Sequence, residues 1–244
     1  MAEIDLGMTS FGMLAEGERL YVTGEKSLVI VDVGDPRNPR LLGESTDAGI
    51  TTGVDVQGAY AYLAGYTQGL VILDIGDPGA PARVGQWGQG TEGRDVVLHG
   101  EVVYLANPDR GLQVIDVSDP AAPWEVMTVP GTEGAWGMHV AGDRLYLGCH
   151  GAGVRLLCLA DPRSPRLLGR FFDGGEAIDV EGDARYLYVA DNEDGVEVLD
   201  AAAPGSLREV AQYERASAHG GIAYDGSYVY LADGRQGLLV FEVQ

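Results

Sequence analysis

Several residue types that mark common protein classes are scarce in this sequence. Its 244 residues include two cysteines, Cys149 and Cys158, fewer than the disulfide framework of a small secreted domain requires. No apolar run of about 18 residues or more is present, so the sequence predicts no helix that spans a membrane. Lys and Arg together number 16 against 37 Asp and Glu, which gives a formal net charge of −21. Such a surface repels nucleic-acid phosphates and anionic membranes, and we expect neither as a partner.

Residues 1–5 lack the basic and apolar regions of a secretory leader. We therefore expect a cytoplasmic protein, or a secreted one if a leader has been removed. We also expect the chain to be a monomer.

A repeat of 42 residues runs through the chain. Its clearest element is a mostly apolar run, which recurs at residues 28–33, 70–75, 112–117, 154–159, 196–201 and 238–243. Proline, tyrosine and glycine recur with the same step. The 37 glycines are about twice the usual share, which favours a turn-rich β protein. An internal period of this length indicates a repeat architecture.

Each copy has the same internal order. In the second copy, a short alternating strand at 54–56 precedes strands at 59–64, 70–75 and 82–87. Continuous apolar runs such as 70–75 predict strands that are buried on both faces. Glycine permits positive φ in tight hairpins, and an Asp-Pro pair after most of the runs pre-sets a turn. Four strands in about 40 residues is typical of the blade of a β-propeller.

The copies therefore predict an all-β fold, a single six-bladed β-propeller of four-stranded blades that occupies residues 1–244 as one domain. A blade cannot bury both of its faces alone and must stack on its neighbours. The sixth copy reaches Gln244 after its third strand, while residues 2–7 precede the first inner strand. We expect residues 2–7 to supply the outer strand of the last blade, which would close the ring and remove an open sheet edge.

The run at 28–32 spells Leu-Val-Ile-Val-Asp, and Asp-Pro-x-x-Pro follows most copies of it. In these residues the chain resembles the LVIVD-repeat family over nearly its whole length. The resemblance implies the propeller fold and says little about function. It also implies a secreted or cell-surface setting for many members, which residues 1–5 do not match. The fifth copy departs from the pattern, with Ala203 and Leu207 in place of the Asp and the second Pro.

Residues that recur in the copies serve the scaffold, whereas positions at which the copies disagree are free for function. The acids at the end of the apolar runs, which are Asp32, Asp74, Asp116 and Asp200, are expected to hold turns by accepting backbone N–H bonds. The recurring tyrosines are expected in the core. Residues 191–195 faintly resemble a calcium loop but lack its terminal Glu. Cys149 and Cys158 are separated by several residue rises on their strands, which predicts two free thiols.

The positions at which the copies disagree gather at one mouth of the predicted channel. In propellers the loops that enter the inner strands and the loops between strands two and three share this face. They carry the candidate binding residues, which are Phe11, Thr52, Tyr66, Arg94, Arg110, Trp136 and Arg235. They also carry the candidate general acids and bases, which are His150, His219 and Glu176. Phe11 and Trp136 could form a stacking wall, and Arg94 could hold a carboxylate or phosphate; the alternative is that these loop residues are simply solvated.

Asp55, His139 and Asp179 lie in one register of the inner strands. We favour a structural role for them, as buried hydrogen-bonded groups that stabilise contacts between blades. No nucleophile elbow, P-loop, dinucleotide fingerprint or zinc spacing is present. We expect no cofactor and no metal, although three histidines near one channel leave a metal open as an alternative.

Two functions fit this pattern. The first is a binding scaffold that takes a small molecule or a protein loop at the channel mouth. The second is a small soluble enzyme of hydrolase, lyase or cyclase type, with His, Glu and Arg in the same pocket. The fold is compatible with both. A structural or assembly protein would predict an apolar patch on the blade sides, which the sequence does not show.

Overall fold

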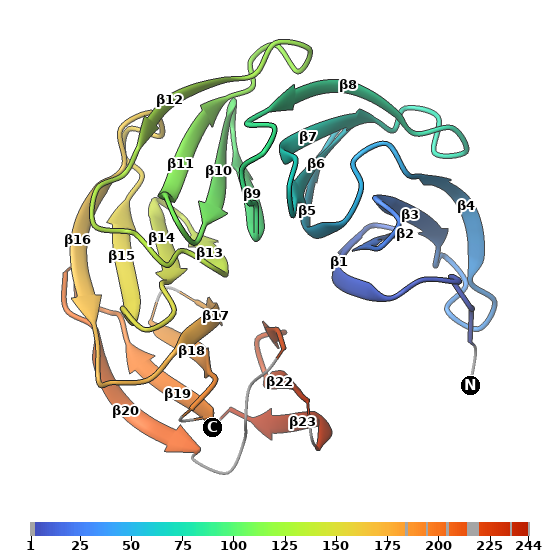
Figure 1. Cartoon of the computed structure of the whole chain (residues 1–244). Helices are drawn as coiled ribbons and strands as arrows, with labels where there is room; N and C mark the ends of the chain where they lie inside the picture. The colour runs from blue at the N-terminus through green and yellow to red at the C-terminus, as the bar shows by residue number, and fades with distance from the viewer. Residues whose placement is uncertain are drawn as a thin grey trace. The chain divides into compact units, whose positions relative to one another are not determined.

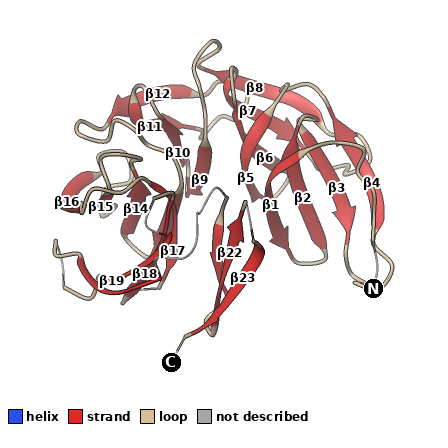
Figure 2. Cartoon of the chain, turned by 60° about the horizontal axis from the view of Figure 1, so that its bottom comes forward, coloured by secondary structure: helices blue, strands red, loops and turns tan. Residues whose placement is uncertain are grey.

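The computed structural model describes residues 3–183, 185–193, 195–203, 205–213, 220–234 and 236–243. In these residues the secondary structure consists of strands, turns and loops, without a helix (Figure 2). The strands form six antiparallel sheets, and each sheet is built from strands that are consecutive in the chain. The chain divides into two compact units. The first comprises Met1–Asn107 with Gln113–Val126, and the second Pro108–Leu112 with Met127–Gln244.

The first two sheets lie in the first unit (Figure 1). Their strands are β1 (Ser10–Glu16), β2 (Arg19–Gly24), β3 (Leu28–Asp32) and β4 (Arg40–Ser45), then β5 (Thr51–Gln57), β6 (Tyr60–Gly65), β7 (Gly69–Asp74) and β8 (Ala82–Trp87). The third sheet has residues in both units. Its strands are β9 (Asp95–His99), β10 (Val102–Asn107), β11 (Gly111–Asp116) and β12 (Trp124–Thr128).

The other three sheets lie in the second unit (Figure 1). The fourth and fifth sheets contain β13 (Met138–Ala141), β14 (Arg144–Gly148), β15 (Val154–Cys158) and β16 (Arg166–Phe171), then β17 (Ala177–Gly182), β18 (Tyr186–Asp191), β19 (Gly195–Asp200) and β20 (Arg208–Tyr213). The last sheet contains β21 (Ile222–Tyr224), β22 (Tyr228–Asp233) and β23 (Gly237–Glu242). The sheets match the predicted blades one to one, so the six-bladed β-propeller class is confirmed.

The third strand of a blade carries much of its core. In β3, β7 and β11 nearly every side chain is buried, because the strand has a neighbour on each side and its apolar residues point to both faces. The recurring tyrosines lie next to this strand, and Tyr62, Tyr104 and Tyr146 are at most 3% exposed. The expected place of these tyrosines in the core is confirmed.

The first five apolar runs are followed by turns that aspartates hold. In the first blade, Gly34 N–H donates to Asp32 Oδ1 at 2.9 Å, and Arg37 N–H donates to Asp35 Oδ1 at 3.0 Å. The same bond to the residue two positions later is made by Asp74, Asp116 and Asp200. The structural role predicted for the repeated acids is therefore confirmed.

Two of the inner-strand acids tie one blade to the next. Asp55 Oδ2 accepts the backbone N–H of Leu98, which lies 43 residues further along, at 2.7 Å. Asp179 Oδ2 accepts the N–H of Ile222, also 43 residues away, at 2.9 Å. Their Oδ1 atoms accept the N–H of the following residue. Asp55 and Asp179 are thus hydrogen-bonded links between blades, as the sequence predicts, although they are only partly buried.

Glycine in the outer strand lets the next blade approach closely. At Gly85 of β8, a Cβ would collide with the carbonyl oxygen of Pro120 in the following Asp-Pro turn. Gly43 and Gly169 hold the same place in β4 and β16. Close backbone approach therefore requires glycine at these positions.

The last sheet differs from the prediction. It has three strands, and residues 3–9 form no strand, so the fourth strand expected from residues 2–7 is absent from the described part of the chain. Alternate apolar residues of this segment instead cover the first blade, where Ile4, Leu6 and Met8 pack against Val22, Val29 and Val31. Lys26 Nζ fixes the segment there by donating to Leu6 O at 3.2 Å. Pairing with β23 would join the two units and stays a prediction, as does the single domain.

Candidate functional site

Within each unit, the entry loops and the hairpin loops meet. His150 N–H, in the β14–β15 hairpin, donates to Ala177 O at the start of β17 at 2.9 Å. Asn192 N–H, in the β18–β19 hairpin, donates to Glu176 O at 3.0 Å. In the first unit, Tyr66 N–H in the β6–β7 hairpin donates to Ile50 O at 2.9 Å. The side chains of these loops are thereby brought to the same end of their blades.

Trp136, His150, Glu176 and Asn192 form a contiguous cluster in the second unit, which we call the His150 cluster. The indole of Trp136 and the imidazole of His150 have centroids 5.4 Å apart and planes inclined at 42°. His150 Nδ1 lies 3.7 Å from Glu176 Oε1. Asn192 Nδ2 donates to Glu176 Oε2 at 2.9 Å. Three predicted site residues are therefore neighbours, and an amide orients the carboxylate among them.

Two features of the His150 cluster lower the stability of the folded protein. His150 has φ of +44°, the single positive φ outside glycine in the described residues, and such a conformation costs about 1–3 kcal/mol. Asn192 Oδ1 is buried and has no hydrogen-bond partner in the described part of the chain. A buried acceptor without a partner is destabilising and rare. Backbone strain and unpaired buried polar groups of this kind are typical of functional sites.

Thr52, Tyr66 and Arg94 come together in the first unit. The guanidinium carbon of Arg94 lies 4.8 Å from the ring centroid of Tyr66, within range of a cation–π interaction. Thr52 Oγ1 donates to Gly93 O at 3.0 Å and so holds the loop that carries Arg94. Arg94 also pairs with the carboxylate of Glu92, a residue that the sequence reasoning missed. An anion at Arg94 would have to compete with Glu92.

The other predicted site residues are either exposed or outside the described part of the chain. Phe11 is 53% exposed at the start of β1, and Arg110 is exposed in the β10–β11 hairpin. Phe11 belongs to the first unit and Trp136 to the second, so a stacking wall made of both stays a prediction. His219 and Arg235 lie outside the described residues.

His139 forms an ion pair that the sequence reasoning missed. Its Nδ1 lies 3.0 Å from Glu181 Oε2 on the inner strand of the next blade. Glu181, and not Asp179, stands opposite the recurring tyrosine of that blade, Tyr188, because two extra residues shift the register there. Burial raises the pKa of Asp179 to about 7, against the effect of its two backbone hydrogen bonds.

A hydrogen bond between two carboxyl groups holds the loop that carries Glu176. Glu197 of β19 is 1% exposed and is hydrogen-bonded to Asp173 in the β16–β17 loop. Burial and the bond to Asp173 raise the pKa of Glu197 to about 9. Glu197 is therefore protonated at neutral pH and can donate to the Asp173 carboxylate.

The two cysteines form no disulfide, and the acidic hairpin forms a local turn at residues 191–193. Cys149 and Cys158 are free thiols, as expected, and burial raises the pKa of Cys149 to about 12, which disfavours a nucleophilic thiolate. Asp191 Oδ1 accepts Glu193 N–H at 2.9 Å in a local turn. Among the described residues, no three or more His, Cys, Asp or Glu side chains are arranged to hold a metal ion.

Six consecutive antiparallel sheets, with unrepeated polar residues on the loops at one end, define a repeat-built β-propeller. Five segments of the chain match the LVIVD repeat, at residues 14–47, 48–87, 90–130, 174–215 and 219–243. The chain belongs to the LVIVD-repeat family. These segments leave out residues 131–173, which contain Trp136 and His150, so part of the His150 cluster lies outside the matched repeats.

Solved structures support the fold. A functionally unknown protein from Desulfotomaculum acetoxidans has 12% identity and a TM-score of 0.80, and the match covers 100% of this chain and 85% of that one. The virginiamycin B lyase of Staphylococcus aureus has 11% identity and a TM-score of 0.75, with 98% and 82% covered. The computationally designed Ika8 protein has 10% identity and a TM-score of 0.71, with 96% and 71% covered.

No curated protein matches the sequence of this chain. The described residues contain no helix with the length and apolar character needed to cross a membrane.

Proposed function

We propose that this protein is a binding scaffold that takes a small polar molecule at the His150 cluster. The observation that carries the proposal is the contact of Trp136, His150 and Glu176, which come from two consecutive blades. Sites for small molecules combine an apolar or aromatic wall with a few convergent polar groups. Here the indole supplies the wall, and the imidazole and the carboxylate supply the polar groups.

The cluster indicates which ligand groups would be favoured. Glu176 is a partly exposed hydrogen-bond acceptor, so the ligand should present O–H or N–H donors. The indole face of Trp136 favours a flat or apolar part of the ligand. A sugar or an aromatic alcohol or amine combines these groups, whereas a plain anion would be repelled by Glu176.

The test is a thermal-shift screen of sugars, aromatic alcohols and aromatic amines against four proteins. Compounds that raise the melting temperature of the wild type should have a smaller effect on Glu176→Gln and on Trp136→Phe. Glu193→Gln is the matched control, because Glu193 is an exposed acid in the neighbouring hairpin. Equal shifts in all four proteins would exclude the His150 cluster as the site.

Acid–base catalysis is the alternative, and the His150–Glu176 pair favours it. Their separation of 3.7 Å exceeds a normal hydrogen bond, and catalytic contacts commonly shorten when a substrate binds. The virginiamycin B lyase with a similar fold suggests a first substrate to try. Turnover of virginiamycin B by the wild type and its loss in His150→Gln would support a lyase, whereas binding without turnover would favour the scaffold.

A further inference from the structure

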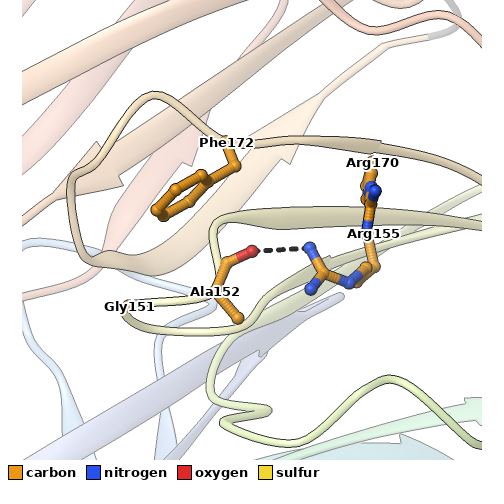
Figure 3. Close-up of a pocket in the computed structure, with 5 residues that line it drawn as sticks. All are labelled: Gly151, Ala152, Arg155, Arg170 and Phe172. Carbon is orange, nitrogen blue, oxygen red and sulfur yellow. Dashed lines mark hydrogen bonds between the residues drawn. The ribbon is translucent and has the colours of Figure 1, made fainter.

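A hollow of about 570 Å³ lies on the fourth blade and is lined by residues that no prediction above includes (Figure 3). Two arginines, Arg155 on β15 and Arg170 on β16, occupy directly opposed positions of the sheet. The β14–β15 hairpin contributes Gly151 and Ala152. Phe172, which follows β16, is 60% exposed and completes the lining.

The two guanidinium groups retain unused donors. Arg155 Nη1 donates to Ala152 O at 2.5 Å, and its Nε donates to Gly131 O at 3.0 Å. These bonds fix the plane of the Arg155 guanidinium and leave Nη2 available. The side chain of Arg170 is exposed and makes no hydrogen bond or ion pair within the described ranges. The guanidinium of Arg155, whose orientation is fixed, therefore lies beside the positive charge of Arg170, which has no ion-pair partner within the described ranges.

The repeat shows that this pair is particular to the fourth blade. The position of Arg155 is Val29 in the first blade, Val71 in the second and Glu197 in the fifth. The position opposite is Glu44, Gln86 and Gln212 in the same blades. Like charges directly opposite each other on a sheet are destabilising, so folding alone gives no reason for two arginines here. Both also lie in residues 131–173, outside the family matches.

We propose that this hollow binds an organic anion whose carboxylate or phosphate is held by Arg155 and Arg170 and whose flat apolar part lies on Phe172. Planar guanidinium groups match the oxygens of carboxylates and phosphates. In a chain with a net charge of −21, such a pair is a local exception that an anion would neutralise. The site is separate from the His150 cluster, and either proposal can fail without the other.

Calorimetric titration at low salt with phenyl phosphate, benzoate and inorganic phosphate tests the proposal. Phenyl phosphate should bind the wild type and should bind Arg170→Gln about tenfold more weakly, because a charge-assisted hydrogen bond is lost. Arg166→Gln is the matched control, since Arg166 is an exposed arginine on the same strand. Phe172→Ser should weaken phenyl phosphate and leave inorganic phosphate unchanged. Benzoate shows whether a carboxylate can replace the phosphate.

Three results would overturn the assignment. One is that none of the three probes binds. A second is equal weakening by Arg166→Gln and Arg170→Gln, which would indicate a general effect of net charge. The third is that inorganic phosphate binds as tightly as phenyl phosphate, which would show that the hollow does not recognise an apolar part of the ligand. Urea unfolding of each variant confirms that it is folded before its titration is interpreted.

Discussion

The imidazole Nδ1 of His150 lies 3.7 Å from Oε1 of Glu176, although the two residues belong to consecutive blades. The main chain sets this distance, because His150 N–H donates to Ala177 O at 2.9 Å. The hairpin of the fourth blade is thereby bound to the entry of the fifth. A change of the His150 side chain removes the imidazole and leaves that backbone bond in place.

Replacing His150 by glycine should stabilise the protein while it abolishes ligand binding. Glycine adopts the φ of +44° without strain, and relief of strain should exceed the added entropy of the unfolded chain by about 0.5–1 kcal/mol. The urea midpoint measures this effect. Ala152→Gly is the matched control in the same hairpin and should destabilise by about 0.4–1 kcal/mol. Equal losses in the two variants would show that no strain is stored at His150.

Replacing Asp55 by alanine should destabilise the first unit. The substitution removes the acceptor of Leu98 N–H and Val56 N–H, and buried donors without partners cost about 1–3 kcal/mol each. Asp35→Ala, which removes one bond in an exposed turn, should cost about 1 kcal/mol or less. Denaturant unfolding compares the two, and an equal loss would contradict the role of Asp55 between blades.

The stability of the second unit should fall as pH rises from about 4.5 to about 9. Glu197 has a pKa of about 9 in the folded protein against 4.5 as its ordinary value. The folded state therefore binds one proton more than the unfolded state across this window, and its stabilising effect is complete below pH 4.5 and lost as pH rises through 9. Asp179, with a pKa of about 7, acts in the same direction between its ordinary value and 7.

Glu197→Gln tests the origin of this pH dependence. Glutamine has nearly the same shape and can still donate to Asp173, but it does not titrate. The fall in melting temperature between pH 5 and pH 9 should become smaller in the variant, and the variant should be more stable than the wild type at the upper end. An unchanged slope would assign the pH dependence to other groups.

Hydrogen exchange can test the predicted closing strand. Pairing with residues 2–7 would protect the β23 amides on the edge that faces away from β22, whereas an open edge would exchange rapidly. Deletion of residues 2–8 should then speed exchange in β23 as well as in the first blade, where Ile4 and Leu6 pack. Unaltered exchange in β23 would contradict closure by this segment.

The fold could be predicted because one pattern is repeated six times, so turn chemistry, core tyrosines and strand order reinforce one another. Residues such as Asp32 and Asp74 were assigned structural roles for this reason, and their hydrogen bonds agree. The comparison of the copies also identified Trp136, His150 and Glu176 as positions that do not recur, and these residues lie together in the second unit.

Contacts that depend on strand register could not be predicted. Glu181 faces His139 because two extra residues in the fifth blade displace the register. Arg170 stands opposite Arg155 in a strand pair that contains a bulge next to that position, between Leu156 and Leu157. Glu92 pairs with Arg94 two residues away along a loop, a geometry that spacing alone does not define.

The proposed function is tested most directly by a crystal structure of the protein soaked with the compounds that raise its melting temperature. We expect ligand density in contact with Trp136, His150 and Glu176, and its disappearance in Glu176→Gln crystals soaked in the same way. Density found only at the opposite end of the blades, beside the Asp-Pro turns, would contradict the assignment of the site.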